Sequence, residues 1–216
     1  MIRVEIWSDV VCPFCYMGKR RFENALKSFQ RKDDVQVVWR SFQLDPDFQP
    51  EPGLSVHDYL AKRKGMPPSE TRRAHERLTS AAAQLGLVYD FDHAVMANTL
   101  DAHRLTHLAR RHGLAEKMEE RLFAAYFTEG RNVGDRETLA ALGAEIGLEA
   151  SEIRTMLAGT DYAEDVQSEA REAHELGADG VPFYVFNRAY AVAGAQPSEL
   201  FLEALEKAEK EVPDPA

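Results

Sequence analysis

The chain has 216 residues, of which 44% are hydrophobic and 29% are charged, proportions typical of a globular protein with a full core. Its 26 Lys and Arg against 36 Asp and Glu give a net charge of −10, which argues against nucleic acid or an anionic membrane as a partner. No stretch reaches the roughly 20 apolar residues that cross a bilayer, and the first residues do not resemble a signal peptide. We therefore expect a cytoplasmic protein, in which a cysteine pair is more often catalytic or metal-binding than structural.

The first part of the chain predicts a strand, a helix and a second strand. Residues 3–9 alternate between apolar and polar side chains, as a half-buried strand does, and Ser8 extends the apolar face. Residues 16–32 place aromatic and aliphatic side chains at helical spacing, and residues 35–44 are rich in β-branched and aromatic residues. Because a helix connects the two strands, we expect them to pair in parallel.

A helical region is predicted next, because strand signals stop at a Pro-rich loop (45–53) and resume only at residue 181. Apolar residues recur at helical spacing in several runs, some of which end near a Gly that suits a helix C-terminus. We interpret residues 51–176 as an all-helical insertion between two parts of one sheet domain, 1–50 and 177–216. The predicted helices span residues 69–85, 94–112, 115–128, 136–146 and 161–177.

The C-terminal part predicts two more strands and a last helix. Residues 181–187 and 190–194 have strand composition, and the short link Arg188–Ala189 predicts a tight antiparallel hairpin between them. Pro197 suits the start of the final amphipathic helix. The predicted fold class is therefore α/β, with a mixed four-stranded sheet, flanking helices and a large all-α insertion.

Cys12 and Cys15, the only two cysteines, lie at the predicted start of the first helix. Their spacing puts them one turn apart on one face, where free N–H groups and the helix dipole favour a thiolate, the reactive form of cysteine. Pro13 suits the first helical position. We expect Cys12, at the helix tip, to be the exposed nucleophile, and Cys15 to be the shielded thiol that resolves a mixed disulfide.

Two other interpretations of the cysteines are weaker. Buried free cysteines often act as small hydrophobic residues, but these two have the spacing of a redox motif directly after a strand. A zinc site would need His103 and His107, which lie far along the chain, unlike the compact spacing of a zinc finger. We therefore predict a redox-active Cys12–Cys15 pair and no metal site.

Pro182 directly precedes a predicted buried strand, where proline is unusual because it cannot donate a hydrogen bond to the sheet. One explanation is a Val181–Pro182 bond held cis in a tight turn, with the Val181 backbone available to an extended peptide. The other is a plain loop proline that enters a strand. The spacing alone leaves both open.

A family resemblance bears on this choice. The segments SDVVCPFCYMGKRR, NTLDAHRL, AAYFTEGRNVGD, GADGVPFYVFN and YAVAGAQ, in this order over nearly the whole chain, are similar to those of the DsbA-like thioredoxin-fold oxidoreductases of the FrnE subgroup. The resemblance implies a thioredoxin fold with an α-helical insertion. It also implies that Cys12 attacks, that Cys15 is its partner and that Val181–Pro182 is a cis-proline element. One departure is Phe14, where Trp is common in this subgroup; Phe14 has no ring N–H to support a thiolate.

Kappa-class glutathione transferases and 2-hydroxychromene-2-carboxylate isomerases share this layout, but they generally carry Ser in place of the first cysteine and use glutathione. Because both cysteines are present, we expect a thiol–disulfide oxidoreductase without a tightly bound cofactor. Its partners would be protein or small-molecule thiols and disulfides, glutathione among them. The alternatives are a glutathione-dependent transferase or isomerase of small aromatic substrates, and a chaperone-like binding module that needs no thiol. Substrate, direction of electron flow and oligomeric state stay open.

Residues around the motif complete the predicted site. The charged run Lys19–Arg21 is interpreted as a solvated helix face. Asp9 either exchanges a proton with Cys15 or caps a loop, and the loop role is favoured. Asn98 and His103 border the active site if the resemblance holds, or are structural, and neither is assigned a catalytic role. The predicted substrate groove comprises Pro13, Phe14, Val181 and Pro182, with an apolar rim of Phe14, Tyr16 and Phe183.

Overall fold

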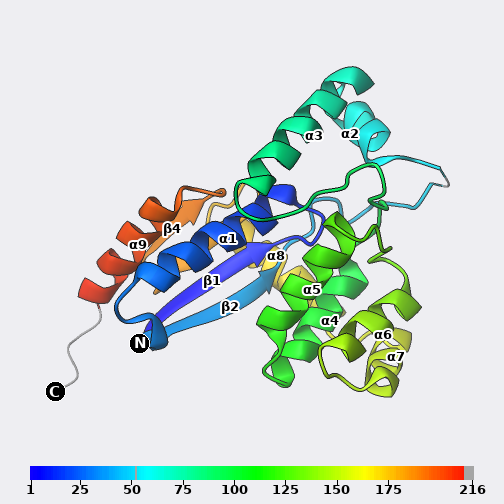
Figure 1. Ribbon diagram of the computed structural model, residues 1–216. Helices are drawn as coiled ribbons and strands as arrows, with labels where there is room; N and C mark the ends of the chain where they lie inside the picture. The colour runs from blue at the N-terminus through cyan, green and yellow to red at the C-terminus, as the bar shows by residue number, and fades with distance from the viewer. Residues whose placement is uncertain (52, 212–216) are drawn as a thin grey trace. The chain divides into compact units, whose positions relative to one another are not determined.

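The computed structural model describes residues 1–51 and 53–211, which form two compact units (Figure 1). The first unit comprises Met1–Leu44 and the chain from Gln167 onward, and the second comprises Asp45–Val166. Among the described residues, none of the helices has the length and apolar character that a membrane span requires.

The first unit is built on a four-stranded mixed sheet, as predicted. Its strands are β1 (Ile2–Ser8), β2 (Val35–Ser41), β3 (Phe183–Phe186) and β4 (Tyr190–Ala193), in the order β2-β1-β3-β4. β1 pairs with β2 in parallel, whereas β3 is antiparallel to both β1 and β4. The crossover from β1 to β2 is helix α1 (Pro13–Ser28), which accounts for the parallel pairing.

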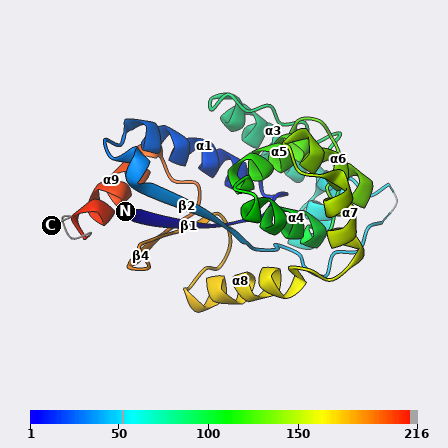
Figure 2. The same cartoon turned by 90° about the horizontal axis from the view of Figure 1, so that it is seen from below.

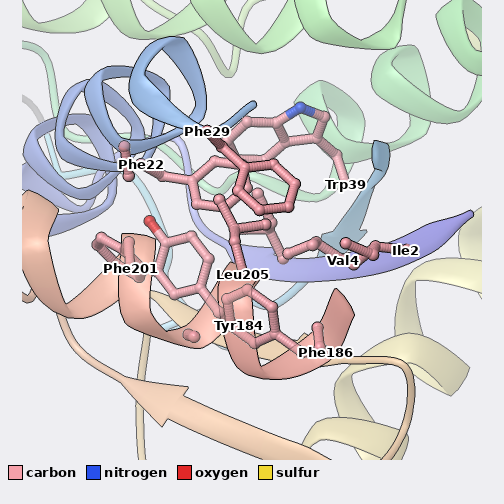
Figure 3. Close-up of a cluster of buried hydrophobic side chains, with 13 residues drawn as sticks. Ile2, Val4, Phe22, Phe29, Trp39, Tyr184, Phe186, Phe201 and Leu205 are labelled. Carbon is pink, nitrogen blue, oxygen red and sulfur yellow. The ribbon is translucent and has the colours of Figure 1, made fainter. Parts of the chain in front are cut away.

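Helices cover both faces of this sheet. Figure 2 shows α1 and α9 (Ser198–Lys210) on one side of the strands and α8 (Ala163–Glu175) on the other. The face under α1 and α9 is apolar and rich in aromatic rings, which pack as shown in Figure 3. Its buried residues include Ile2, Val4, Ile6, Phe22, Phe29, Trp39, Tyr184, Phe186, Phe201 and Leu205.

The hairpin between β3 and β4 turns one residue earlier than predicted. Asn187 and Arg188 both have positive φ, 48° and 58°, and the Ala189 N–H donates to the Phe186 carbonyl at 2.9 Å. Positive φ at both central residues is the hallmark of a type I′ turn, whose twist suits a tight hairpin. The predicted link Arg188–Ala189 was therefore displaced by one position, because an Arg in a left-handed conformation is not a sequence signal of a turn.

The second unit is helical, as expected for the insertion. It contains α2 (Val56–Lys64), α3 (Pro68–Ala83), α4 (Leu100–Arg111), α5 (Ala115–Phe127), α6 (Arg136–Glu145) and α7 (Ala150–Ala158). Two of these helices, α2 and α7, were not predicted, and both are nine residues long. The predicted helix 94–112 begins later, at Leu100, whose N–H is bound by the Asn98 side chain at 3.0 Å.

Candidate active site

The two cysteines lie where β1 passes into α1. Cys12 is the residue before the helix, with extended backbone angles, and Pro13 occupies the first helical position. The Cys12 N–H donates to the Asp9 carbonyl at 3.0 Å, and the Cys12 carbonyl accepts the Cys15 N–H at 3.0 Å. These bonds fix a tight turn that places both thiols at the helix N-terminus, as predicted from their spacing.

Cys12 faces the loop before β3. Its thiol donates to the Val181 carbonyl at 3.5 Å, and the Val181–Pro182 bond is cis, as the resemblance implied. The Pro182 carbonyl accepts the Gly194 N–H at 2.8 Å, which ties this loop to the end of β4. The prediction of an exposed Cys12 was wrong: only 3% of the residue is exposed, because its side chain turns toward Val181.

Cys15 is the more deeply buried thiol, with 1% of the residue exposed. Burial raises its pKa well above the usual range, and the neighbouring Cys12 thiol raises it further. The Asp9 backbone and the Ser8 hydroxyl oppose this effect without cancelling it. Both cysteines are free. The raised pKa means that the site of Cys15 favours the thiol over the thiolate.

Gly18, one turn after Cys15, lets α1 approach the sheet closely. A Cβ at this position would lie 2.6 Å from the Tyr184 hydroxyl oxygen and 3.1 Å from Pro182 Cγ. A side chain here would force the Tyr184 hydroxyl, and to a smaller extent Pro182, to shift, so glycine allows the helix to lie close to Pro182 and β3.

Asp9 occupies the loop between β1 and the cysteines. Its residue is 1% exposed, and its carboxylate accepts the Leu44 N–H at 2.8 Å. This contact agrees with the loop role favoured from the sequence, in which an aspartate side chain accepts a hydrogen bond from a nearby backbone N–H. Proton exchange with Cys15 stays an untested prediction.

The predicted rim and helix face differ from expectation. Phe14 projects from the helix start with 49% of the residue exposed, but Tyr16 and Phe183 are both buried at 4%. Phe183 packs on the α8 face of the sheet beside Trp7, so it is not part of a rim. Lys19 is not solvated either: it is 3% exposed, and its ammonium group forms an ion pair with Glu23 one turn along the helix.

Asn98 and the two histidines belong to the second unit. The Asn98 amide donates to the Pro46 and Phe48 carbonyls at 2.9 and 3.3 Å, which is a structural role within that unit. His103 and His107 are buried along α4, and His107 stacks on Tyr162. In the described part of the chain, no group of three or more His, Cys, Asp or Glu side chains could hold a metal ion.

Three residues near the thiols were missed by sequence reasoning. Gly18 and Tyr184 are recognisable only once α1 is docked on β3. Ser8 had a usable signal, because it is a polar residue at the end of the apolar face of β1, directly before the cysteine loop.

Comparisons with known proteins agree with this arrangement. Residues 3–206 match the family model described as a DSBA-like thioredoxin domain. The chain is 30% identical over 213 residues to the uncharacterized protein YwbO of Bacillus subtilis, covering 97% of this chain and 98% of that protein. It is 42% identical to a probable DsbA oxidoreductase of Streptomyces coelicolor, whose crystal structure superposes with a TM-score of 0.93 over 100% of this chain and 93% of the other.

More distant structures share the fold. A 2-hydroxychromene-2-carboxylate isomerase is 17% identical, with a TM-score of 0.71 over 97% of each chain. The cytosolic disulfide reductase DsbM of Pseudomonas aeruginosa, solved with glutathione, is 22% identical, with a TM-score of 0.62 over 96% of this chain and 99% of the other. The family model spans nearly all of the chain and includes the cysteine turn, the cis-proline loop and the helical unit, so the protein belongs to the family of DsbA-like thioredoxin-domain proteins.

Proposed function

We propose that the protein is a thiol–disulfide oxidoreductase that works through a mixed disulfide on Cys12. The observation that carries this proposal is the placement of two free thiols at the start of α1, with Cys12 within 3.5 Å of the carbonyl that precedes the cis proline. The helix N-terminus favours a thiolate, which is the attacking species in disulfide exchange. Phe14, exposed beside the pair, would contact the substrate together with Pro13, Val181 and Pro182.

The reaction follows from the two thiols. The Cys12 thiolate attacks one sulfur of a substrate disulfide, the substrate S–S bond breaks, and the other half leaves as a thiolate that takes up a proton. Cys15 then attacks the Cys12 sulfur, which forms the Cys12–Cys15 disulfide and releases the second half. The substrate is reduced by two electrons and the protein is oxidised; the same steps in reverse oxidise a substrate dithiol.

Substitution of each cysteine tests this proposal. In dithiol-driven reduction of insulin, Cys12→Ser should lower the rate to that of the uncatalysed reaction, whereas Cys15→Ser should accumulate a covalent protein–substrate adduct. Circular dichroism of each variant checks that the fold is kept. Full activity of Cys12→Ser would exclude the mechanism. The direction of electron flow, which depends on the reduction potential of the pair, is measured by equilibration with glutathione.

A second candidate is a glutathione-dependent transferase or isomerase of small aromatic substrates. It is favoured by the shared fold with the isomerase and with DsbM, which was solved with glutathione. This candidate predicts glutathione binding and turnover that survive Cys15→Ser. Suppression of aggregation by a variant lacking both thiols would instead favour a chaperone-like role. We also propose that the protein is cytoplasmic and that it belongs to the FrnE subgroup of the DsbA-like proteins.

A further inference from the structure

Ser8 lies under the cysteine turn because of the strand alternation of β1. Val4 and Ile6 point into the core beneath α1, and Ser8 continues that face by the same period of two. Cys15 is buried in the first turn of α1, the helix that covers this face of the sheet. The alternation of β1 therefore places the Ser8 hydroxyl on the face of the sheet that α1 covers, which is the face next to Cys15.

The hydroxyl of Ser8 is buried without a regular hydrogen bond in the described part of the chain. Ser8 is 1% exposed, and within residues 1–51 and 53–211 its Oγ atom makes no hydrogen bond of regular geometry. Most buried hydroxyls in proteins have a partner, because an unpaired one costs free energy. An unpaired hydroxyl beside a thiol is explained if its hydrogen-bond acceptor, a thiolate, exists only during the reaction.

Cys15 is the group that supplies this partner. Ser8 is the last residue of β1 and Cys15 lies in the first turn of α1, the helix that packs on the same face as Val4 and Ile6, and both residues are 1% exposed. The Ser8 hydroxyl acts to lower the pKa of the Cys15 thiol, against the effect of burial. A neutral thiol is a weak acceptor, whereas a thiolate is a strong one, and hydrogen bonds that serve a reaction often tighten only when charge develops. A second buried hydroxyl without a hydrogen bond among the described residues is that of Tyr184. It lies next to Gly18, one helical turn after Cys15.

We propose that the Ser8 hydroxyl is the side-chain donor that stabilises the Cys15 thiolate as it attacks the Cys12 mixed disulfide. This inference rests on the proposed function. In the step, Cys15 loses its proton and forms an S–S bond with Cys12, the bond from Cys12 to the substrate sulfur breaks, and the leaving thiolate gains a proton. The hydroxyl offsets part of the cost of a negative sulfur in a buried site.

A single-turnover experiment separates this step from the rest. The reduced protein is mixed with an aromatic disulfide that releases a coloured thiolate twice, first when Cys12 attacks and then when Cys15 resolves. Ser8→Ala should leave the first phase unchanged and slow the second by at least about tenfold, the effect of one hydrogen bond to a charged group. Ser8→Thr, which keeps a hydroxyl, should restore the second phase to within about threefold of the parent rate.

A matched control is Ser41→Ala, since Ser41 is the register partner of Ser8 on β2 and is equally buried, at 2%. This control should leave both phases unchanged. An unaltered second phase in Ser8→Ala, or an equal slowing in Ser41→Ala, would overturn the assignment. Absence of the first phase in the parent protein would instead contradict the proposed function, so the two failures are distinguishable.

Discussion

The two faces of the four-stranded sheet are made by the same strands, but one buries apolar side chains and the other buries charged side chains in ion pairs. Under α1 and α9 the side chains are almost all apolar, and the polar groups at the edge, Ser8 and Tyr184, are neutral hydroxyls. On the α8 face, Glu5 is buried at 1% and is held by two arginines that also flank the Trp7 ring. The strands thus keep their charged side chains on the face away from Cys15, which is why the proposed resolving step would draw on an uncharged donor.

The ionic face forms one connected network. Glu5 accepts hydrogen bonds from Arg40 at 2.9 Å and from Arg188 at 2.6 Å, and Arg40 also donates to Glu169 at 2.8 Å. The Trp7 indole N–H donates to the Glu169 carbonyl at 2.8 Å. Because Glu5 and Glu169 are paired with arginines, these carboxylates can be buried at a lower cost in free energy than an isolated carboxylate.

The largest effect is expected on the apolar face. Phe22 packs against Tyr184, Phe186 and Phe201, with ring centroids 5.7–6.5 Å apart, so Phe22→Ala should lower the free energy of unfolding by about 3–5 kcal/mol. Urea denaturation measures this loss. Phe14→Ala, at an exposed ring, is the control and should change stability by less than about 0.5 kcal/mol. A loss below about 1 kcal/mol for Phe22→Ala would mean that this face does not dominate the core.

On the ionic face, Glu5→Gln removes the buried carboxylate that Arg40 and Arg188 share, and leaves them only Glu169 and Glu172, respectively. We expect a loss of about 3 kcal/mol, somewhat below the apolar case because Arg188 is 40% exposed and can be rehydrated. The matched control is Arg31→Ala, which breaks an exposed pair with Asp34 and should cost less than about 1 kcal/mol. Equal losses in the two variants would show that burial adds nothing to the Glu5 network.

Gly18→Ala tests how closely the apolar face is packed. The new methyl group would meet the Tyr184 hydroxyl, so we expect a loss of about 1–2 kcal/mol despite the better helix propensity of alanine. Tyr184→Phe removes the opposing oxygen, and the double variant should regain most of the loss. A thermodynamic cycle over the four proteins gives the coupling, and additive effects would rule out the contact.

The smallest effect is a difference in acid sensitivity between the faces. Burial acts to raise the pKa of Glu5, but the hydrogen bonds from Arg188 and Arg40 outweigh it and hold the pKa below its ordinary value of 4.5. This stabilisation is therefore complete above about pH 4.5 and is lost as the pH falls toward the folded-state pKa. Between about pH 5 and pH 3, Glu5→Gln should lose less stability than the parent protein. Parallel curves would show that Glu5 does not titrate as described.

The sequence predicted what depends on local pattern. The alternation of residues 3–9, the helical spacing around Phe22 and the cysteine turn were all confirmed, because each follows from the period of a single element. The buried Cys12, the Phe183 side chain on the α8 face and the ion pair of Lys19 were not predicted, because they depend on which element packs opposite. The pattern of β1 does show Ser8 as a polar residue on an apolar face, but its position relative to Cys15 depends on how α1 packs on the sheet.

The type I′ turn at Asn187–Arg188 has a consequence for how the fold assembles. A left-handed Arg is energetically unfavourable in isolation, so the turn has no strong local preference to form first. The Arg188 side chain contacts Glu172 of α8, 16 residues away, and Glu5 of β1, 183 residues away in sequence. The β3–β4 hairpin should therefore close only after it docks on β1, late in folding, as a dependent element rather than a nucleus.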